Sequence, residues 1–212
     1  TNQVAKTAAA MATPPAPEVV RHLYGPRLTK QRDTLFKPML AANFAHVVML
    51  VRQGIITHPI GTQLLEGLKS LAAEGPDAVN WDPKLEDMYY NLEAWLIMKI
   101  GIEAAGRLHT GRSRNDLYAT LSRMYVRERL IVAGLQLTSL REAILTLAEE
   151  NVATIVTGYT HLQPAQPLTL GHYLSAVAAA LQREHVRLTA AYVATNQSSL
   201  GACARAGTSF PI

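Results

Sequence analysis

Apolar residues recur at helical spacing along most of the chain. In the first hundred residues, three runs carry apolar positions three or four apart, which predicts helices over residues 38–53, 57–74 and 85–100. Glycine follows each run, at Gly54, Gly75 and Gly101, as expected where a helix ends. The connections between the runs are short, so we expect a compact helical region.

A different pattern begins at residue 116, where apolar positions alternate steps of four and three up to residue 150. These positions are Val126, Leu130, Ala133, Leu137, Leu140, Ile144 and Leu147. The seven-residue repeat predicts one helix roughly 50 Å long that packs against near-parallel neighbours. A comparable stripe predicts a further helix over residues 168–195. No strand of useful length is predicted.

Two long helices cannot bury their apolar stripes against each other alone, because a helix bundle needs about four. We therefore expect this chain to be the front part of a larger protein, or to need other subunits. The predicted fold class is all-α. We expect a flexible tail at residues 1–17, a helical N-terminal domain at 18–112, and the first, incomplete part of a central helix bundle at 113–212.

Composition narrows the class of protein. Apolar residues make up 49 % of the chain, enough for a sizeable core, and the net charge of +4 comes from scattered basic residues, which argues against a nucleic-acid partner. No uninterrupted apolar run reaches the roughly 18–20 residues of a membrane span. The single cysteine, Cys203, excludes an internal disulfide framework and a cysteine-based zinc site. We expect a cytoplasmic protein with neither membrane nor metal.

The first candidate for chemistry is Leu-His-Thr-Gly-Arg-Ser-Arg-Asn-Asp at 108–116, directly ahead of the long helix. A helix start presents unpaired N–H groups and attracts anions. Ser113 and Asn115 can cap that helix or bind a ligand, and Arg114 can form a bidentate pair with a carboxylate or phosphate. The alternative is a capping loop with solvated arginines.

The second candidate is Gly-Tyr-Thr-His-Leu-Gln-Pro-Ala-Gln-Pro at 158–167, also just before a predicted helix. Its prolines stiffen the backbone around Thr160 and His161. A histidine can transfer protons near neutral pH. The alternative is a loop histidine bonded to backbone. No second ligand stands at metal-binding spacing from His161, and the acidic residues Glu86 and Asp87 are expected to solvate a helix start.

These two segments resemble the first two signatures of the argininosuccinate lyase family, in the fumarase/aspartase superfamily. Leu-Tyr-Gly-Pro-Arg-Leu at 23–28 and Ala-Gly-Thr-Ser-Phe-Pro-Ile at 206–212 resemble two further segments of that family. The resemblance covers nearly everything after the tail and corresponds to the N-terminal part of the family's chain.

The resemblance implies an all-helical fold of three domains whose central domain is a long helix bundle. It also implies a homotetramer in which the central helices of four subunits form one core and active sites combine residues of three subunits. The implied reaction splits argininosuccinate into arginine and fumarate, without a cofactor. A base removes a proton beside a carboxylate, fixed donors stabilise the resulting dianion, and the amine leaves.

Carried onto this sequence, the resemblance assigns the substrate's carboxylates to Ser113, Arg114, Asn115 and Thr160, and assistance in proton transfer to His161. The family's serine-bearing loop, Gly-Ser-Ser-x-Met-Pro-x-Lys-x-Asn-Pro, has no match in these residues. We expect either that the sequence is partial or that the chain is inactive alone.

Other departures from the family concern the leaving group. Leu117 replaces a usual glutamine, and Tyr89 or Tyr90 stands where the family often has histidine. A related lyase for another N-succinyl amine or aminocarboxylic acid is therefore an alternative, and so is a structural homologue without catalysis.

Overall fold

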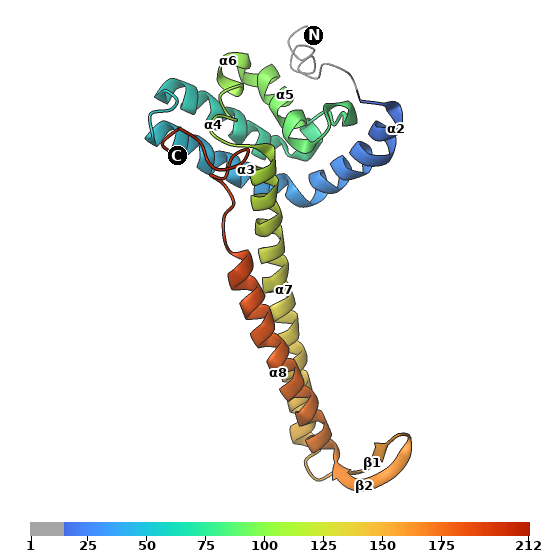
Figure 1. The fold of residues 1–212 in the computed structure, drawn as a ribbon. Coiled ribbons are helices and arrows are strands. Elements are labelled where there is room, and N and C mark those ends of the chain that lie inside the picture. The colour runs from blue at the N-terminus through green and yellow to red at the C-terminus, as the bar shows by residue number, and fades with distance from the viewer. Residues whose placement is uncertain (1–14) are drawn as a thin grey trace. The chain divides into compact units, whose positions relative to one another are not determined.

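The computed structural model describes residues 15–212, which form helices and one small two-stranded sheet (Figure 1). They divide into two compact units. Of the described residues, unit 1 comprises 15–125 and Ser198–Ile212, and unit 2 comprises Val126–Gln197. The predicted helical fold class is confirmed. The tail predicted at 1–17 lies outside the described residues except for its last three, and a helix already begins at Pro17.

Unit 1 is a cluster of helices joined by short turns. They are α2 (Pro17–Val19), η1 (Val20–Tyr24), α3 (Gly25–Arg52), α4 (His58–Glu74), η2 (Pro76–Ala78), η3 (Pro83–Leu85), α5 (Met88–Ile100), α6 (Ile102–Ala105) and the first turns of α7 (Arg114–Glu150). Their apolar faces share one core, whose fully buried members include Met39, Leu50, Leu64, Leu68, Leu92, Leu96, Leu117 and Leu121. The start of α7 is therefore anchored in this core.

Helix α3 corrects the prediction that the first helix begins at Pro38. The helix begins at Gly25 and carries Pro38 inside it. An internal proline removes one backbone hydrogen bond and costs about 3 kcal/mol. Apolar residues on both sides of it, among them Leu28 and Phe36, are buried in the core. This burial exceeds the cost of the proline, so the helix continues through it.

Helix α5 begins at Met88 rather than at residue 85, because Asp87 caps it. The Asp87 carboxylate accepts a hydrogen bond from the Tyr90 N–H at 3.1 Å. The three residues before this cap turn as the short 3₁₀ helix η3. The prediction that α4 begins after Thr57 and ends at Gly75 is confirmed.

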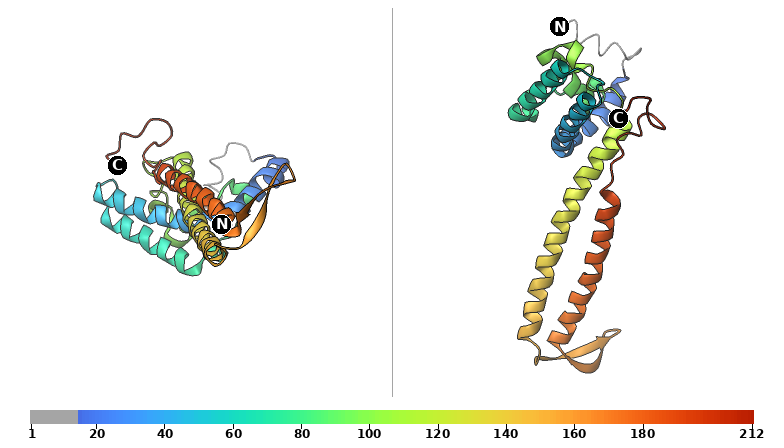
Figure 2. Two further views of the ribbon diagram at one scale, coloured as in Figure 1. Left: turned by 90° about the horizontal axis from the view of Figure 1, so that it is seen from below. Right: turned by 90° about the vertical axis from the view of Figure 1, so that its left-hand side faces the viewer.

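Unit 2 consists of the rest of α7, a β-hairpin and α8 (Leu170–Thr195). The two long helices predicted from the heptad pattern are confirmed, and they run side by side in Figures 1 and 2. Arg127 Nη1 donates to Asn196 Oδ1 at 2.9 Å, and Arg141 Nε donates to the Ala178 carbonyl at 3.3 Å.

Few side chains of unit 2 are buried. Among its described residues only Ala148, Gly158, Gly171 and Ala178 are buried. The exposed large apolar residues are Val126, Ile131, Val132, Leu135, Leu140, Leu145, Leu147, Val152, Ile155, Tyr159, Leu162, Tyr173, Val186 and Val193. The predicted stripe positions are mostly half-buried, whereas many apolar residues beside them are exposed. The two helices thus leave much apolar surface uncovered. The domain boundary predicted at residue 113, and the incomplete bundle after it, stay predictions.

The hairpin corrects the prediction that no strand is present. Strand β1 (Ile155–Thr160) pairs antiparallel with β2 (Gln163–Thr169) through the two-residue turn His161-Leu162. Both turn residues have positive φ, 49° and 65°, as a tight hairpin turn requires. The β-branched residues at 155–157 favour a strand. The prolines of β2 are tolerated because a two-stranded sheet has only edge strands.

Two helical stretches are long and apolar enough to meet a simple criterion for a membrane span, Pro17–Arg52 and Arg114–Glu150. The sequence analysis considered only uninterrupted apolar runs, whereas this criterion allows up to two charged residues in the apolar window. In the first stretch, 56 % of the apolar window is buried inside the protein. In the second stretch, none of the apolar window is buried, in agreement with the exposed apolar residues of unit 2.

Candidate functional site

The start of α7 is closed by a reciprocal cap. The Ser113 hydroxyl accepts a hydrogen bond from the Asn115 N–H at 3.2 Å, and the Asp116 carboxylate accepts one from the Ser113 N–H at 3.0 Å. Serine followed three residues later by an acidic residue is a known pattern for a helix start. The cap gives residues 113–115 one defined backbone course.

Asp116 also ties the returning segment 198–212 to this helix start. Its second carboxylate oxygen accepts from the Cys203 N–H at 2.7 Å, and the Cys203 thiol donates to the Gly111 carbonyl at 2.9 Å. The Ser199 N–H donates to Thr120 Oγ1 at 3.2 Å. Asp116 itself is buried. One carboxylate therefore joins two segments that lie 87 positions apart.

Arg114 is held by an acidic pair. Its Nη1 lies 2.7 Å from Asp87 Oδ2 and 3.1 Å from Glu86 Oε2. The guanidinium also stacks over the Tyr90 ring, 4.2 Å from its centroid. Burial lowers the pKa of Arg114, but the Asp87 carboxylate outweighs this effect and the pKa is raised. Arg114 is thus a positioned, permanently charged group.

Both acidic partners of Arg114 contact the same nitrogen. In the part of the chain that the structure describes, no hydrogen bond or ion pair engages Nη2 or Nε. The side chain is 29 % exposed. A guanidinium whose outer edge reaches solvent can bind a carboxylate through two parallel hydrogen bonds. Asn115 is exposed beside it.

Arg112 points to a different set of partners. Its Nη2 donates to Asn43 Oδ1 at 2.7 Å, its Nε donates to His109 Nδ1 at 3.4 Å, and its guanidinium lies 5.5 Å from the centroid of the Tyr89 ring. The residue is only 8 % exposed. The alternative of solvated arginines in this loop is therefore wrong for Arg112, and Arg114 is also mostly covered.

Two histidines beside Arg112 are held neutral. Burial and the nearby charge of Arg112 lower the pKa of His46 to about 4, and the same causes lower the pKa of His109 to about 4. His46 Nε2 lies 2.9 Å from the Thr110 carbonyl, so a neutral His46 donates its proton there. His109 belongs to the 109–112 turn, and His46, on α3, supports that turn through its bond to Thr110.

A buried tyrosine and a carboxyl group lie next to this cluster. The Tyr89 hydroxyl donates to Glu93 Oε1 at 3.0 Å. Burial raises the pKa of Glu93, and it also raises the pKa of the Tyr89 hydroxyl. The Tyr89 N–H donates to the Tyr118 hydroxyl at 3.0 Å, which links α5 to α7.

The second predicted cluster lies on the hairpin of unit 2. Thr160 is the last residue of β1 and pairs with Gln163, and His161 is the first residue of the turn. Both are exposed. The structure thus brings Ser113, Arg114 and Asn115 together in unit 1, and Thr160 and His161 together in unit 2. The joint site that the sequence predicts from the two sets stays a prediction.

Sequence reasoning missed the groups that position Arg114. Glu86 and Asp87 were expected only to solvate a helix start, but they form its ion pairs. The available signal was the acidic pair directly before an apolar run.

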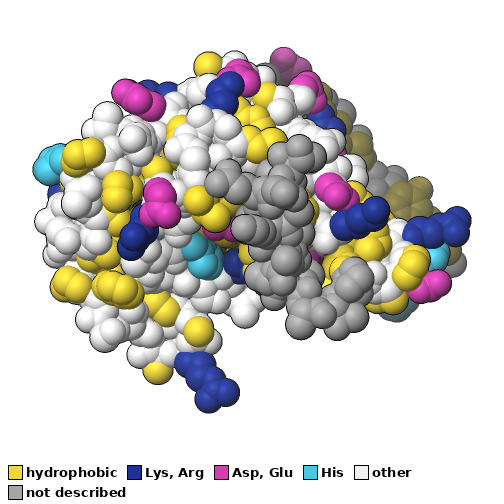
Figure 3. Space-filling model, turned by 90° about the horizontal axis from the view of Figure 1, so that it is seen from above, with side chains coloured by type: hydrophobic (Ala, Val, Ile, Leu, Met, Phe, Trp, Pro, Cys, Tyr) yellow, Lys and Arg dark blue, Asp and Glu magenta, His cyan; other side chains and the backbone are white. Residues whose placement is uncertain are grey.

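Among the described residues, no group of three or more His, Cys, Asp or Glu side chains could hold a metal ion. On the face in Figure 3, charges of both signs are interspersed.

Comparison with known proteins places this geometry in a family context. The family model described as "Lyase" matches residues 27–212. Argininosuccinate lyase 1 of Shouchella clausii is 39 % identical over 198 residues, which are 93 % of this chain and 40 % of that protein. The argininosuccinate lyase of Methanocaldococcus jannaschii is 42 % identical over 178 residues, which are 84 % of this chain and 37 % of that protein. The chain spans about 40 % of the length of such relatives.

Solved structures agree. EDDS lyase in complex with formate matches with a TM-score of 0.79 and 33 % identity, over 94 % of this chain and 39 % of that chain. The β-carboxy-cis,cis-muconate cycloisomerase of Acinetobacter calcoaceticus matches with a TM-score of 0.69 and 22 % identity, over 91 % of this chain and 43 % of that chain. The latter likeness concerns the fold alone.

The Asp116 carboxylate should be central to the stability of unit 1. We expect Asp116→Ala to lower the free energy of unfolding by about 2–4 kcal/mol, because it removes a helix cap and leaves the Cys203 N–H without its acceptor. Urea unfolding of the whole protein measures this. Asp33→Ala, at an exposed position of α3, is the control and should change stability by less than about 0.5 kcal/mol. Equal effects of the two variants would contradict the role of Asp116.

The neutral histidines predict a dependence of stability on pH. Because the folded-state pKa values of His46 and His109 lie near 4, below the ordinary 6.5, the unfolded state binds more protons between these values. Stability should therefore fall as the pH drops from 6.5 towards 4, by about 1.4 kcal/mol per pH unit for each histidine.

Unfolding at a series of pH values tests this dependence. His46→Gln and His109→Gln should each flatten the slope, whereas His22→Gln, at an exposed position, should leave it unchanged. The idea fails if both buried-site variants keep the parent slope.

Proposed function

The chain belongs to the lyase family whose model matches residues 27–212, and from this premise we propose that the whole protein is a carbon–nitrogen lyase that converts argininosuccinate into arginine and fumarate. The similarity to argininosuccinate lyases, at about 40 % identity over most of the chain, supports this substrate. The single observation that carries the proposal is Arg114, a charged group fixed by Asp87 and Glu86 at a helix start with its outer edge towards solvent.

The proposed chemistry needs a grip on a dicarboxylate. Arg114 binds one carboxylate of the succinyl group through two hydrogen bonds, and Ser113, Asn115 and Thr160 donate further bonds. As a base removes the proton beside that carboxylate, negative charge builds up on its oxygens, and these donors stabilise it. His161 assists the proton transfer. No cofactor takes part, and the base belongs to the remainder of the protein.

The proposed assembly is a homotetramer with shared active sites, in the cytoplasm. The exposed apolar residues of α7 and α8 support it, because four copies of these helices would cover each other's apolar surface as a bundle does. Thr160 and His161 of one subunit would then meet residues 113–115 of another.

A second candidate is the reaction of EDDS lyase, whose solved structure is 33 % identical. A variant of that protein has been solved with bound fumarate. The observation that favours such an alternative leaving group is this likeness, which covers 94 % of the chain with a TM-score of 0.79. Fumarate formed from each of several N-substituted aspartates, followed by ultraviolet absorbance, separates these candidates. A whole protein that releases fumarate from none of them contradicts the family of reactions.

His161 should be required for turnover. We expect His161→Asn to lower kcat for argininosuccinate by roughly 10²–10⁴-fold, the usual contribution of general acid–base catalysis. His172→Asn is the matched control, since His172 is an exposed histidine at the start of α8. It should keep activity within about twofold. Retained activity in His161→Asn would remove the histidine from the mechanism.

Site sharing predicts recovery of activity in mixed oligomers. Arg114→Gln and His161→Asn should each be nearly inactive alone. If one site takes Arg114 and His161 from different subunits, random co-assembly leaves roughly a quarter of the sites with both residues intact. Activity should then return to about that fraction. Two residues from the same subunit would give no recovery, which would contradict the shared site.

A further inference from the structure

Arg112 is a buried cation with no carboxylate at ion-pairing distance among the described residues; Asp116 and Glu93 favour its charge from farther away. Its contacts are the amide oxygen of Asn43, the ring nitrogen of His109 and the face of Tyr89, none of which is ionised. Among the described residues no ion pair involves Arg112, and its Nη1 is buried without a hydrogen-bond partner. Burying an N–H group of a cation without a hydrogen-bond acceptor is costly. The Nη1 group of Arg112 therefore lacks a hydrogen-bond acceptor among the described residues.

The polar groups around Arg112 do not supply an acceptor for Nη1. The Asn43 amide oxygen accepts a hydrogen bond from Arg112 Nη2. The Asn43 amide nitrogen Nδ2, another donor, has no hydrogen-bond partner. His46 and His109 are neutral, because their pKa values are lowered to about 4. The unpaired polar atoms of this cluster are thus both donors, whereas the Asp116 oxygens already accept from Ser113 and Cys203 and Glu93 Oε1 accepts from Tyr89.

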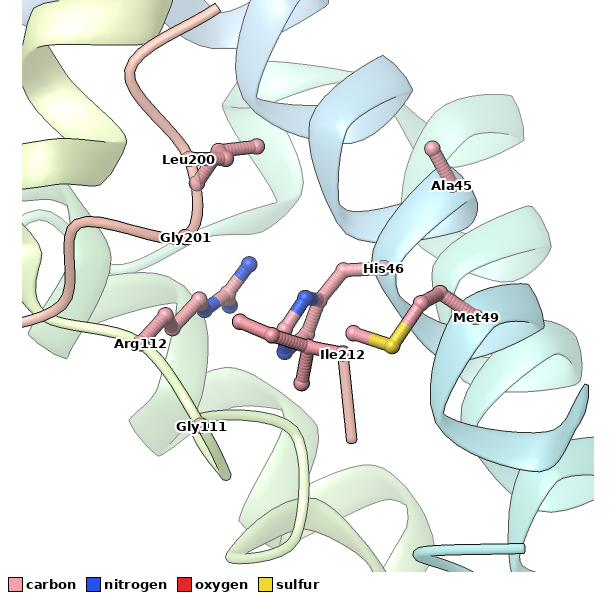
Figure 4. A pocket seen from close by; sticks show the side chains of 8 residues that line it. All are labelled: Ala45, His46, Met49, Gly111, Arg112, Leu200, Gly201 and Ile212. Carbon is pink, nitrogen blue, oxygen red and sulfur yellow. The ribbon is translucent and has the colours of Figure 1, made fainter. Parts of the chain in front are cut away.

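A cavity of about 280 Å³ lies directly beside the guanidinium. Figure 4 shows Arg112 and His46 among the side chains that line it, together with Met49 and Ile212. Leu200 and Ala45 complete the apolar part of the wall. All of these residues belong to unit 1. The cavity thus has a wall formed by Arg112 and the neutral His46 ring, and its other side chains are apolar.

We propose that this cavity binds a small monocarboxylate with a short apolar body. Its carboxylate accepts hydrogen bonds from Arg112, and its apolar end packs against Met49, Leu200 and Ile212. A charge-assisted pair of this kind is about twice as strong as a neutral hydrogen bond. A phosphate group needs several donors, whereas one guanidinium among apolar side chains matches a singly charged amphiphile.

Such a ligand would contact two separate segments. Arg112 belongs to the 109–112 turn, and Leu200 and Ile212 belong to the segment that returns to it. Binding would hold these segments together and raise the stability of unit 1, since a ligand that binds only the folded state stabilises it. The proposal does not depend on the substrate of the lyase reaction.

Calorimetric titration of the whole protein with butyrate tests the proposal. Arg112→Met removes the cation, and Ala45→Leu fills the cavity from an exposed position without touching a polar group. Arg114→Met separates this pocket from any carboxylate binding at residues 113–115. We expect the first two variants to weaken butyrate binding by roughly tenfold or more. In Arg114→Met, binding to the pocket should persist.

Three results would overturn the proposal. They are butyrate binding that is lost only in Arg114→Met, unchanged binding in both Arg112→Met and Ala45→Leu, and no binding to the parent protein at tens of millimolar. If Arg112→Met does not fold, as judged by circular dichroism, Ala45→Leu decides the question. Fumarate release is a separate measurement, so failure of the lyase proposal and failure of this one are distinguishable.

Discussion

The carboxylate of Asp116 is the point on which the candidate site depends. One oxygen closes the start of α7 through Ser113, and the other anchors the returning segment through Cys203. Because Asp116 is buried, both bonds are shielded from water, and losing either would leave a donor unsatisfied. This carboxylate therefore joins the helix start to the segment 198–212. It fixes the backbone between Arg112 and Arg114, whose side chains are held by Asn43 and by the acidic pair.

These two arginines use the same chemistry in opposite ways. Arg114 meets its acidic partners, Asp87 and Glu86, at one nitrogen and presents its remaining edge outward. Arg112 turns inward, to neutral partners and an apolar cavity. Two positive groups thus stand close in sequence without sharing an environment.

Helix positions were largely predictable from the sequence, because apolar spacing reports which face is buried. The start of α3 was not, since Pro38 is a strong local breaker and only the packing of residues on both sides of it shows that the helix continues. The hairpin was missed because prolines and an unusual turn pair, His161-Leu162, mask its strands. The 109–116 motif could be identified from the sequence, but the residues that bind to it from other segments could not. Asp87 lies 27 positions before Arg114 and Cys203 lies 87 after Asp116, and no local pattern reports such distances.

The exposed apolar residues of α7 and α8 affect how efficiently a newly made chain reaches its folded state. A newly made chain carries this apolar surface in water until something covers it, so the yield of folded protein depends on how soon that encounter occurs. At low expression the encounter is slow, and chaperones compete for the same surface. In the proposed tetramer, a copy that carries a defect outside these helices would still associate with intact copies and lower the activity of the shared sites.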